Sequence, residues 1–172
     1  QSGKGVIGYL LEHQFGYDLP KKMREDVGYT VKSISDHAHA ELSPDEVLKA
    51  FTDNYININT PIKLIDYHFF RSESIKVMLT VEMNGETKEV IANGTGRLDA
   101  VSNAVRDSLG VSFSELTYEE HALTIGSSSQ AISYVGITLD NGKLVWGAGV
   151  NDDIIAASIN ALFSAINRGL QA

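Results

Sequence analysis

Two copies of one pattern occupy the C-terminal two-thirds of the chain, and this repeat constrains the fold more than any other feature. In the first copy, apolar and polar residues alternate over residues 75–83, and Asn84-Gly85 then gives a strong hairpin signal before a return strand. A glycine pair, Gly94 and Gly96, leads directly into a segment with apolar residues at helical spacing. The first copy therefore predicts two antiparallel strands, a sharp turn and a helix.

The second copy repeats the same order of elements. A strand-like segment precedes Asn141-Gly142, the return strand reaches Gly147 and Gly149, and a helical pattern runs over residues 152–167. The same order of strand, hairpin turn, return strand, glycine pair and helix in both copies therefore predicts a duplicated structural unit.

Each copy also has room for one more strand ahead of its hairpin, over residues 62–71 and 113–125. We therefore expect an α+β fold with two tandem β-β-β-α modules. One such module leaves a sheet face partly uncovered, so two modules packed together make a more complete domain. An acid follows each glycine pair by three residues, at Asp99 and Asp152, which suggests that the two junctions are equivalent.

Residues 1–58 carry helical signals of their own. Asp18 is a candidate N-cap for a helix with a proline in its first turn. Ser43 and Glu46 have the spacing of a capping box, and Pro44 stands between them at the first helical position. We therefore expect a small helical subdomain ahead of the two modules.

The polar segment 57–61, which ends in a proline, is the best candidate for a boundary. It divides the chain into a helical linker subdomain over residues 1–58 and a two-module domain over residues 59–172. The chain opens at Gln1 without an initiator Met or a signal-like segment, so we expect it to be a piece of a longer protein.

Charge and composition exclude several classes of function. A net charge of −8 argues against nucleic-acid binding, which requires a basic face. No apolar run approaches the roughly 18 residues of a membrane-spanning helix, and the absence of cysteine removes thiolate metal sites. His37, His39 and Glu41 lie in a polar connection and are expected to be solvated rather than to bind a metal. His121 has no accompanying nucleophile, so no catalytic group of residues is expected.

The glycine–helix junctions allow two interpretations. "GTGRLD" lacks the third glycine of a dinucleotide fingerprint and follows a hairpin, which disfavours nucleotide binding. The glycines could merely permit the turn. Alternatively, two helix N-termini could attract a carboxylate while Asp99, Asp152 or Asp153 faces an ammonium group, which together describe an α-amino acid pocket.

The last helical segment is apolar on more than one face, which predicts a surface for a partner. Because closed two-fold pairs are the commonest oligomers, we expect a homodimer through this region. The apolar residues are Ile154, Ile155, Ile159, Leu162, Phe163 and Ile166.

Several stretches of the chain occur together, and in this order, in one known family. They are "QSGKGVIGYLLEHQFGYDLPKKM", "LSPDEVLKAFTDNYI", "GTGRLDAV", "YEEHALTIGSSSQAISYV" and "WGAGV" with "DIIAASINALFSAINR". The chain resembles the C-terminal part of the 2-isopropylmalate synthases over essentially its whole length, most closely the long form of fungi and actinobacteria.

The resemblance implies a regulatory fragment without chemistry of its own. Enzymes of this family condense acetyl-CoA with 3-methyl-2-oxobutanoate in an N-terminal barrel that holds a divalent metal, and that barrel has no counterpart in this sequence. No cofactor is therefore expected in this chain. Its expected partners are L-leucine as feedback inhibitor, a second copy of the chain, and the catalytic barrel of the parent. The expected location is the cytoplasm, or the mitochondrion for a fungal source.

The family's leucine-site positions carry over to nine residues of this chain. Asp99 and Ser129 stand where relatives can have alanine, and Arg97 where a relative can have proline, so the pocket is expected to be more polar. Two alternatives stay open: a citramalate synthase domain that responds to isoleucine, and a dimerisation module that binds no effector. The nine residues are Gly94, Gly96, Leu98, Asp99, Tyr118, Ala122, Ser129, Ala131 and Ile154.

Overall fold

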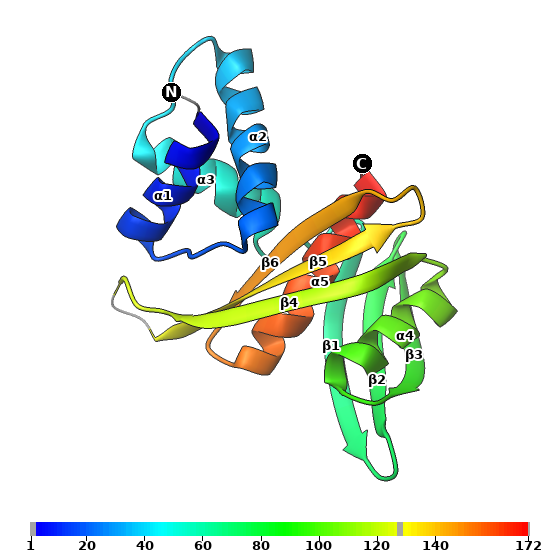
Figure 1. The fold of residues 1–172 in the computed structure, drawn as a ribbon. Coiled ribbons are helices and arrows are strands. Elements are labelled where there is room, and N and C mark those ends of the chain that lie inside the picture. Colours follow the sequence, from blue (N-terminus) through cyan, green and yellow to red (C-terminus); the bar gives the residue numbers. More distant parts are fainter. Residues whose placement is uncertain (1–2, 127–128, 172) are drawn as a thin grey trace.

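A computed structural model describes residues 3–126 and 129–171, and within these ranges three helices precede two β-β-β-α modules (Figure 1). The helices are α1 (Gly3–Phe15), α2 (Lys21–Ala38) and α3 (Pro44–Tyr55). The first module comprises β1 (Ile62–Arg71), β2 (Ile75–Met83), β3 (Glu86–Gly94) and α4 (Arg97–Leu109). The second comprises β4 (Phe113–Leu123), β5 (Gln130–Leu139), β6 (Leu144–Asn151) and α5 (Ile154–Gln171). The expected α+β fold with two tandem modules is confirmed.

The two modules share one topology. Each sheet is antiparallel, with the strand orders β1-β2-β3 and β4-β5-β6. In both sheets the register shifts near the start of the first strand, between Leu64 and Asp66 in β1 and between Ser114 and Thr117 in β4. A bulge at the same place in both copies supports the duplication.

The first hairpin turn has the geometry that its sequence predicts. Asn84 and Gly85 both have positive φ, at 55° and 77°. Positive φ at both central residues is the requirement of the tight turn that joins right-twisted strands, and Asn-Gly meets it at low steric cost.

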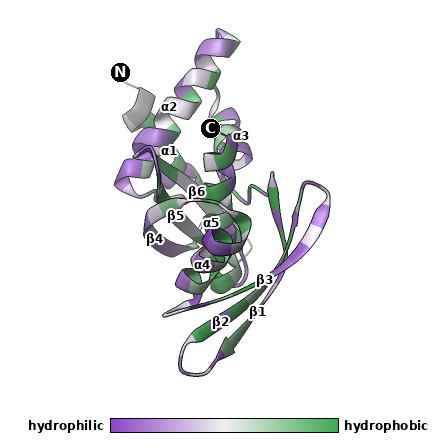
Figure 2. Ribbon diagram, turned by 90° about the vertical axis from the view of Figure 1, so that its right-hand side faces the viewer, coloured by the Kyte–Doolittle hydropathy of each residue, from purple (hydrophilic) through white to green (hydrophobic). Residues whose placement is uncertain are grey.

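One hydrophobic core is shared by both modules. The inner face of the first sheet contributes Val77 and Leu79, and Val101 of α4 packs against the same cluster. Val135 of β5 and Leu162 of α5 extend that cluster into the second module. Figure 2 shows mostly apolar colouring along β1 and β2. The expectation that the two modules pack together is thus confirmed.

Helix α5 is an interior helix, and this corrects one expectation. It covers β5 and β6, and it also contacts β1, α3 and α4. Ile159, Leu162, Phe163 and Ile166 are all buried within this one chain. Four of the six apolar residues from which a partner surface was predicted are therefore unavailable to a second copy, because the chain's own elements cover them, whereas Ile154 and Ile155 are only partly buried.

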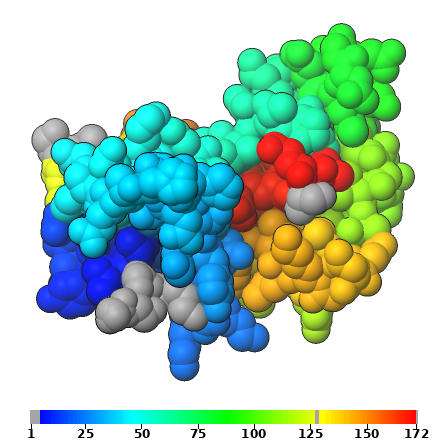
Figure 3. Space-filling model, turned by 90° about the horizontal axis from the view of Figure 1, so that it is seen from above, coloured from blue at the N-terminus to red at the C-terminus, as the bar shows by residue number. Residues whose placement is uncertain are grey.

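The three N-terminal helices cover the outer face of the second sheet. Tyr134 of β5 and Trp146 of β6 belong to the same buried cluster as Met23, Phe51 and Tyr55 of the helices. Figure 3 shows the C-terminal end of α5 (red) next to α2 and α3 (cyan). The second sheet is therefore covered on both faces, by α5 on the inner one and by the helices on the outer one.

The cap of α3 is the one predicted from the sequence, whereas the cap of α2 is not. Ser43 donates its backbone N–H to Glu46 Oε1 (2.8 Å), and Glu46 donates its own to Ser43 Oγ (3.2 Å), so the capping box is confirmed. The prediction of Asp18 as an N-cap is wrong. Pro20 occupies that position without a side-chain cap, and Asp18 instead accepts a hydrogen bond from Arg24 (2.7 Å).

The segment after α3 is anchored to the second module. Asn57 donates its backbone N–H to Ala148 O (2.9 Å), and Val150 donates its N–H to Asn57 Oδ1 (3.1 Å). Asn167 of α5 accepts a hydrogen bond from the N–H of Ile62 (2.8 Å). The division of the chain at residues 58 and 59 stays a prediction, although these bonds join the two sides closely. No helix in the described ranges has the length and apolarity that crossing a bilayer requires.

Candidate ligand-binding pocket

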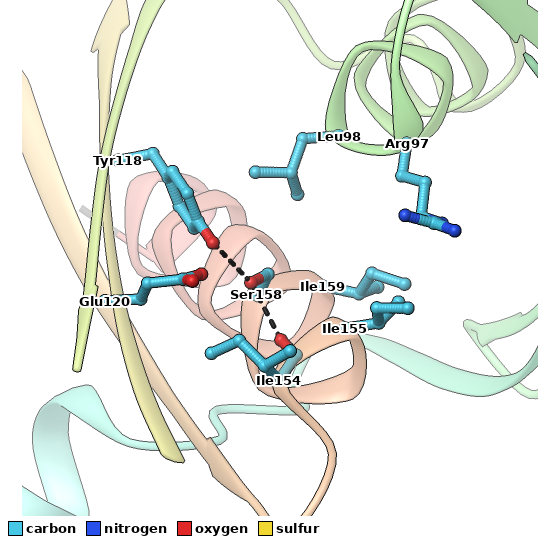
Figure 4. A pocket seen from close by; sticks show the side chains of 8 residues that line it. All are labelled: Arg97, Leu98, Tyr118, Glu120, Ile154, Ile155, Ser158 and Ile159. Atoms are coloured by element: carbon cyan, nitrogen blue, oxygen red, sulfur yellow. Dashed lines mark hydrogen bonds between the residues drawn. The ribbon is translucent and has the colours of Figure 1, made fainter. Parts of the chain in front are cut away.

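A pocket of about 330 Å³ lies where the N-terminal ends of α4 and α5 approach β4 (Figure 4). This volume is at the lower end of the range typical of small-molecule sites. The lining side chains are Arg97, Leu98, Tyr118, Glu120, Ile154, Ile155, Ser158 and Ile159.

One wall of the pocket is apolar. Ile154 and Ile155 open α5, and Ile159 lies one turn further along the same face. Leu98, in the first turn of α4, faces them across the pocket (Figure 4). Together they form a surface that suits an aliphatic side chain.

Two hydroxyl groups lie next to this wall. Ser158 donates a hydrogen bond to Ile154 O (2.8 Å), and its oxygen lies 3.2 Å from the Tyr118 hydroxyl. Ser158 is buried, whereas Tyr118 is 41% exposed on β4. The hydroxyl of Tyr118 is thus held at the pocket by a buried partner while its ring remains accessible.

The pocket also contains both signs of charge. The Glu120 side chain extends from β4 toward the two hydroxyls, and Arg97 lies on the opposite side near Ile155 (Figure 4). The Arg97 guanidinium carbon is 5.9 Å from the centre of the Phe69 ring. Within the described residues, neither charge has an ion-pair partner. A ligand that carries both charges would therefore find complementary groups here.

The acids that start the helices make local hydrogen bonds. Asp99 Oδ2 accepts the backbone N–H of Thr95 (2.7 Å). Asp153 Oδ1 accepts the N–H of Ile155 (3.0 Å). The interpretation that Asp99 or Asp153 offers a free carboxylate to an ammonium group is therefore not supported, whereas Asp152 has no hydrogen-bond or ion-pair partner among the described residues.

The two helix starts differ in how they are capped. The N-cap of α4 is Gly96, which has no side chain to accept a hydrogen bond. At the start of α5, the carboxylate of Asp153 accepts a hydrogen bond from the first-turn N–H of Ile155. The first N–H groups of α4 consequently have no side-chain cap, and they carry the partial positive charge of a helix start.

The two glycine pairs are not equivalent, which corrects the expectation drawn from their spacing. Gly94 ends β3 and Gly96 caps α4, whereas Gly147 and Gly149 both lie inside β6. A Cβ on Gly94 would lie 2.4 Å from a backbone nitrogen of α4, and one on Gly149 would lie 2.0 Å from a backbone oxygen of α5. A Cβ on Gly96 would meet nothing within 4 Å. Gly94, Gly147 and Gly149 therefore lie where a strand closely approaches a helix. Of the four glycines, only Gly96 lies at a helix start and faces open space.

The structure brings together three of the nine expected site residues. Leu98, Tyr118 and Ile154 line the pocket, and Gly96 directly precedes them at the start of α4. Asp99 points back to Thr95.

The other expected residues are not among those that line the pocket. Ala122 and Ala131 are cross-strand neighbours further along β4 and β5. Ser129 is exposed just before β5, and Gly94 is at the end of β3. Whether these positions contact a ligand stays a prediction.

Four lining residues were not assigned to the pocket from the sequence, although each had a signal in its spacing. Glu120 is two residues from Tyr118 and therefore lies on the same strand face. Ser158 and Ile159 are four residues from Ile154 and Ile155 and share their helix face. These residues are Glu120, Ile155, Ser158 and Ile159, whereas Arg97 was already expected to make the pocket more polar.

The fold and the pocket place the chain among duplicated β-β-β-α domains with a small-molecule-sized cavity at their helix starts. More specifically, the chain belongs to the family of LeuA allosteric (dimerisation) domains, whose model matches residues 41–170. That match begins ahead of α3 and includes both modules.

The similar proteins are 2-isopropylmalate synthases. The chain is 50% identical to that of Desulfitobacterium hafniense over 167 residues, which cover 97% of this chain and 30% of the relative. It is 42% identical to that of Helicobacter hepaticus, over 98% of this chain and 32% of the relative. It is 38% identical to the enzyme of Agrobacterium fabrum, over 99% of this chain and 31% of the relative. The chain thus spans less than a third of the length of these relatives.

Proposed function

We propose that this chain is the leucine-binding regulatory part of a 2-isopropylmalate synthase. In this role it mediates feedback inhibition of the condensation of acetyl-CoA with 3-methyl-2-oxobutanoate, which the barrel of the parent chain performs. The pocket between α4, α5 and β4 is the observation that carries the proposal, together with the family match.

The pocket has the parts that a leucine molecule requires. Leu98, Ile155 and Ile159 offer an apolar wall to the isobutyl group, and burying such a group is worth about 1.5–3 kcal/mol. The N-terminal N–H groups of α4 have no side-chain cap beside Gly96, and such groups bind a carboxylate well.

Helix α5 supports a regulatory role because it reaches from the pocket to the helical part. Ile154 and Ser158 line the pocket at one end, and Arg168 contacts Tyr55 of α3 at the other. Leucine would inhibit by stabilising one arrangement of α5 and the helices, with a coupling of about 1–3 kcal/mol. The family description as a dimerisation domain supports action as a homodimer.

Isothermal titration calorimetry of this chain with L-leucine tests the proposal. We expect saturable binding, whereas the absence of heat at millimolar leucine would contradict it. A parallel titration with L-isoleucine separates the leucine assignment from a citramalate synthase domain, for which isoleucine would be the tighter ligand. A chain that is dimeric in light scattering yet binds neither amino acid would be a dimerisation module alone.

The variant Gly96→Val locates the site. A Cβ at Gly96 would have no described heavy atom within 4 Å, so we expect the valine side chain to enter the open space in front of α4. We expect loss of leucine binding with an unchanged circular dichroism spectrum. Wild-type affinity in this variant would place the leucine site elsewhere.

A further inference from the structure

Glu120 is the one described pocket-lining carboxylate, and it has no partner in the structure. We propose that Glu120 binds the ammonium group of the effector, so that the pocket selects an α-amino acid over a carboxylic acid with the same carbon skeleton. This inference rests on the proposed function, and it assigns to the site a residue that determines specificity.

The strand geometry directs Glu120 into the pocket. Side chains alternate along β4, so Glu120 shares its face with Tyr118, and both line the pocket. Glu119 and His121 point to the other side of the sheet. There His121 Nε2 lies 2.8 Å from the hydroxyl of Tyr134, which is buried among the N-terminal helices. Neighbouring glutamates on one strand thus face different surroundings.

Two other acids at the helix starts, Asp99 and Asp153, already accept local hydrogen bonds. Asp99 accepts two hydrogen bonds from Thr95, from the backbone N–H (2.7 Å) and from Oγ1 (3.2 Å). Asp153 accepts the N–H of Ile155. Moving the Asp99 carboxylate toward a ligand would break its bonds to Thr95, and moving that of Asp153 would break its bond to the first turn of α5. Glu120 can bind without losing a hydrogen bond.

The groups around Glu120 complete a site for an ammonium. Such a group has three N–H donors, and the Glu120 carboxylate and the Tyr118 and Ser158 oxygens are acceptors directed to the same part of the pocket (Figure 4). Leu98 and Ile154 lie next to these acceptors, which leaves the ligand's aliphatic part in apolar surroundings.

A buried hydroxyl group on the neighbouring strand also supports a ligand-binding role for Glu120. Ser133 lies directly opposite Glu120 in the register of β4 and β5, is fully buried, and has an Oγ without a hydrogen-bond partner. An unsatisfied buried hydroxyl is unfavourable. Glu120 turned inward over a bound ligand would give this hydroxyl an acceptor.

The test compares two ligands that differ in the ammonium group alone, L-leucine and 4-methylpentanoate. We expect the wild-type chain to bind leucine more tightly in calorimetry. Because hydrogen bonds between charged groups are strong, Glu120→Gln should weaken leucine binding about 10- to 100-fold. It should leave the binding of 4-methylpentanoate unchanged or slightly improved, since a carboxylate near that ligand's own charge is removed.

Glu119→Gln is the matched control, because it removes the same charge from the opposite face of the same strand. We expect this variant to bind leucine as the wild type does. Equal leucine affinity in the wild type and in a folded Glu120→Gln variant would overturn the role of Glu120 while the proposed function stands. Equal affinity of the wild type for leucine and 4-methylpentanoate would also overturn it. A wild-type chain that does not bind leucine at all would instead overturn the proposed function.

Discussion

Arg168 of α5 lies over the ring of Tyr55 of α3, with its guanidinium carbon 3.8 Å from the ring centre. The same guanidinium donates to Trp146 O (2.8 Å) and lies 3.6 Å from the carboxylate of Asp26, which also accepts the Tyr55 hydroxyl (2.6 Å). One side chain thereby joins α2, α3, β6 and α5. Since α5 begins at the pocket, this contact is where the pocket's helix meets the N-terminal helices.

Removing the Arg168 head group should loosen that junction. Arg168→Met loses the contact with Tyr55 and the hydrogen bond to Trp146, and it leaves Asp26 without its cation. We expect the free energy of unfolding to fall by about 2–3 kcal/mol in urea titrations, since such contacts are worth about 0.5–2 kcal/mol each. Arg168→Lys keeps the charge but not the planar stacking, so its loss should be smaller. Wild-type stability in Arg168→Met would show that the junction does not hold the helices.

Burial makes Tyr134 sensitive to alkaline pH. Desolvation raises the pKa of its hydroxyl in the folded chain, while the unfolded chain has the ordinary value of about 10. The neutral form is thus favoured by folding, so its stabilising contribution is fully present below pH 10 and is lost as the pH rises above it. We expect the free energy of unfolding to fall steeply above about pH 10. Tyr134→Phe should lessen this fall.

Tyr9→Phe is the control for that measurement. Tyr9 lies on α1 and is 66% exposed, so its replacement removes a tyrosine without changing the buried cluster. An identical pH dependence in Tyr134→Phe and in the wild type would contradict the role of burial at Tyr134.

The glycines of β6 and of the α4 start should respond differently to alanine. A Cβ on Gly149 would lie 2.0 Å from Ala157 O, so β6 and α5 would have to move apart. Such overpacking costs about 1–3 kcal/mol or more, and we expect Gly149→Ala to lose about 3 kcal/mol in urea unfolding. Gly96→Ala meets open space at an extended φ of −150°, so its loss should stay below about 1 kcal/mol. Equal losses would contradict the assigned packing role of Gly149.

Local signals could be predicted from the sequence because their partners lie within a few residues. Ser43 and Glu46 bond to each other, and Asn84-Gly85 forms its turn without help from distant elements. The alternation in β2 likewise marks its buried face, with Val77 and Leu79 inside. These features established both modules and the start of α3.

Features that depend on distant contacts could not be predicted in the same way. An apolar helix such as α5 has the same sequence pattern whether its own chain or a partner covers it. Gly149, like Gly96, follows another glycine by two residues and precedes an Asp by three, but its packing role depends on how closely α5 approaches β6. Leu98, Tyr118 and Ile154 line one pocket, and their contact with a ligand stays a prediction. The spacing of Glu120 from Tyr118 gives its strand face, but the local sequence does not show that α5 begins opposite it.

The buried amide of Asn167 offers the sharpest test of how α5 holds the segment after α3. Its Oδ1 accepts the N–H of Ile62, and its Nδ2 donates to Ile58 O and Ile62 O, each at 2.8 Å. Asn167→Ala leaves these backbone groups unsatisfied inside the protein, which costs about 1–3 kcal/mol for each buried group. We expect a loss of at least about 3 kcal/mol in the free energy of unfolding. Asn103→Ala removes a partly exposed amide that donates to Asn93 O and accepts from Arg106, whose partners stay accessible to water, so its loss should be smaller, about 1 kcal/mol. Similar losses in both variants would show that the amide of Asn167 does not anchor this segment.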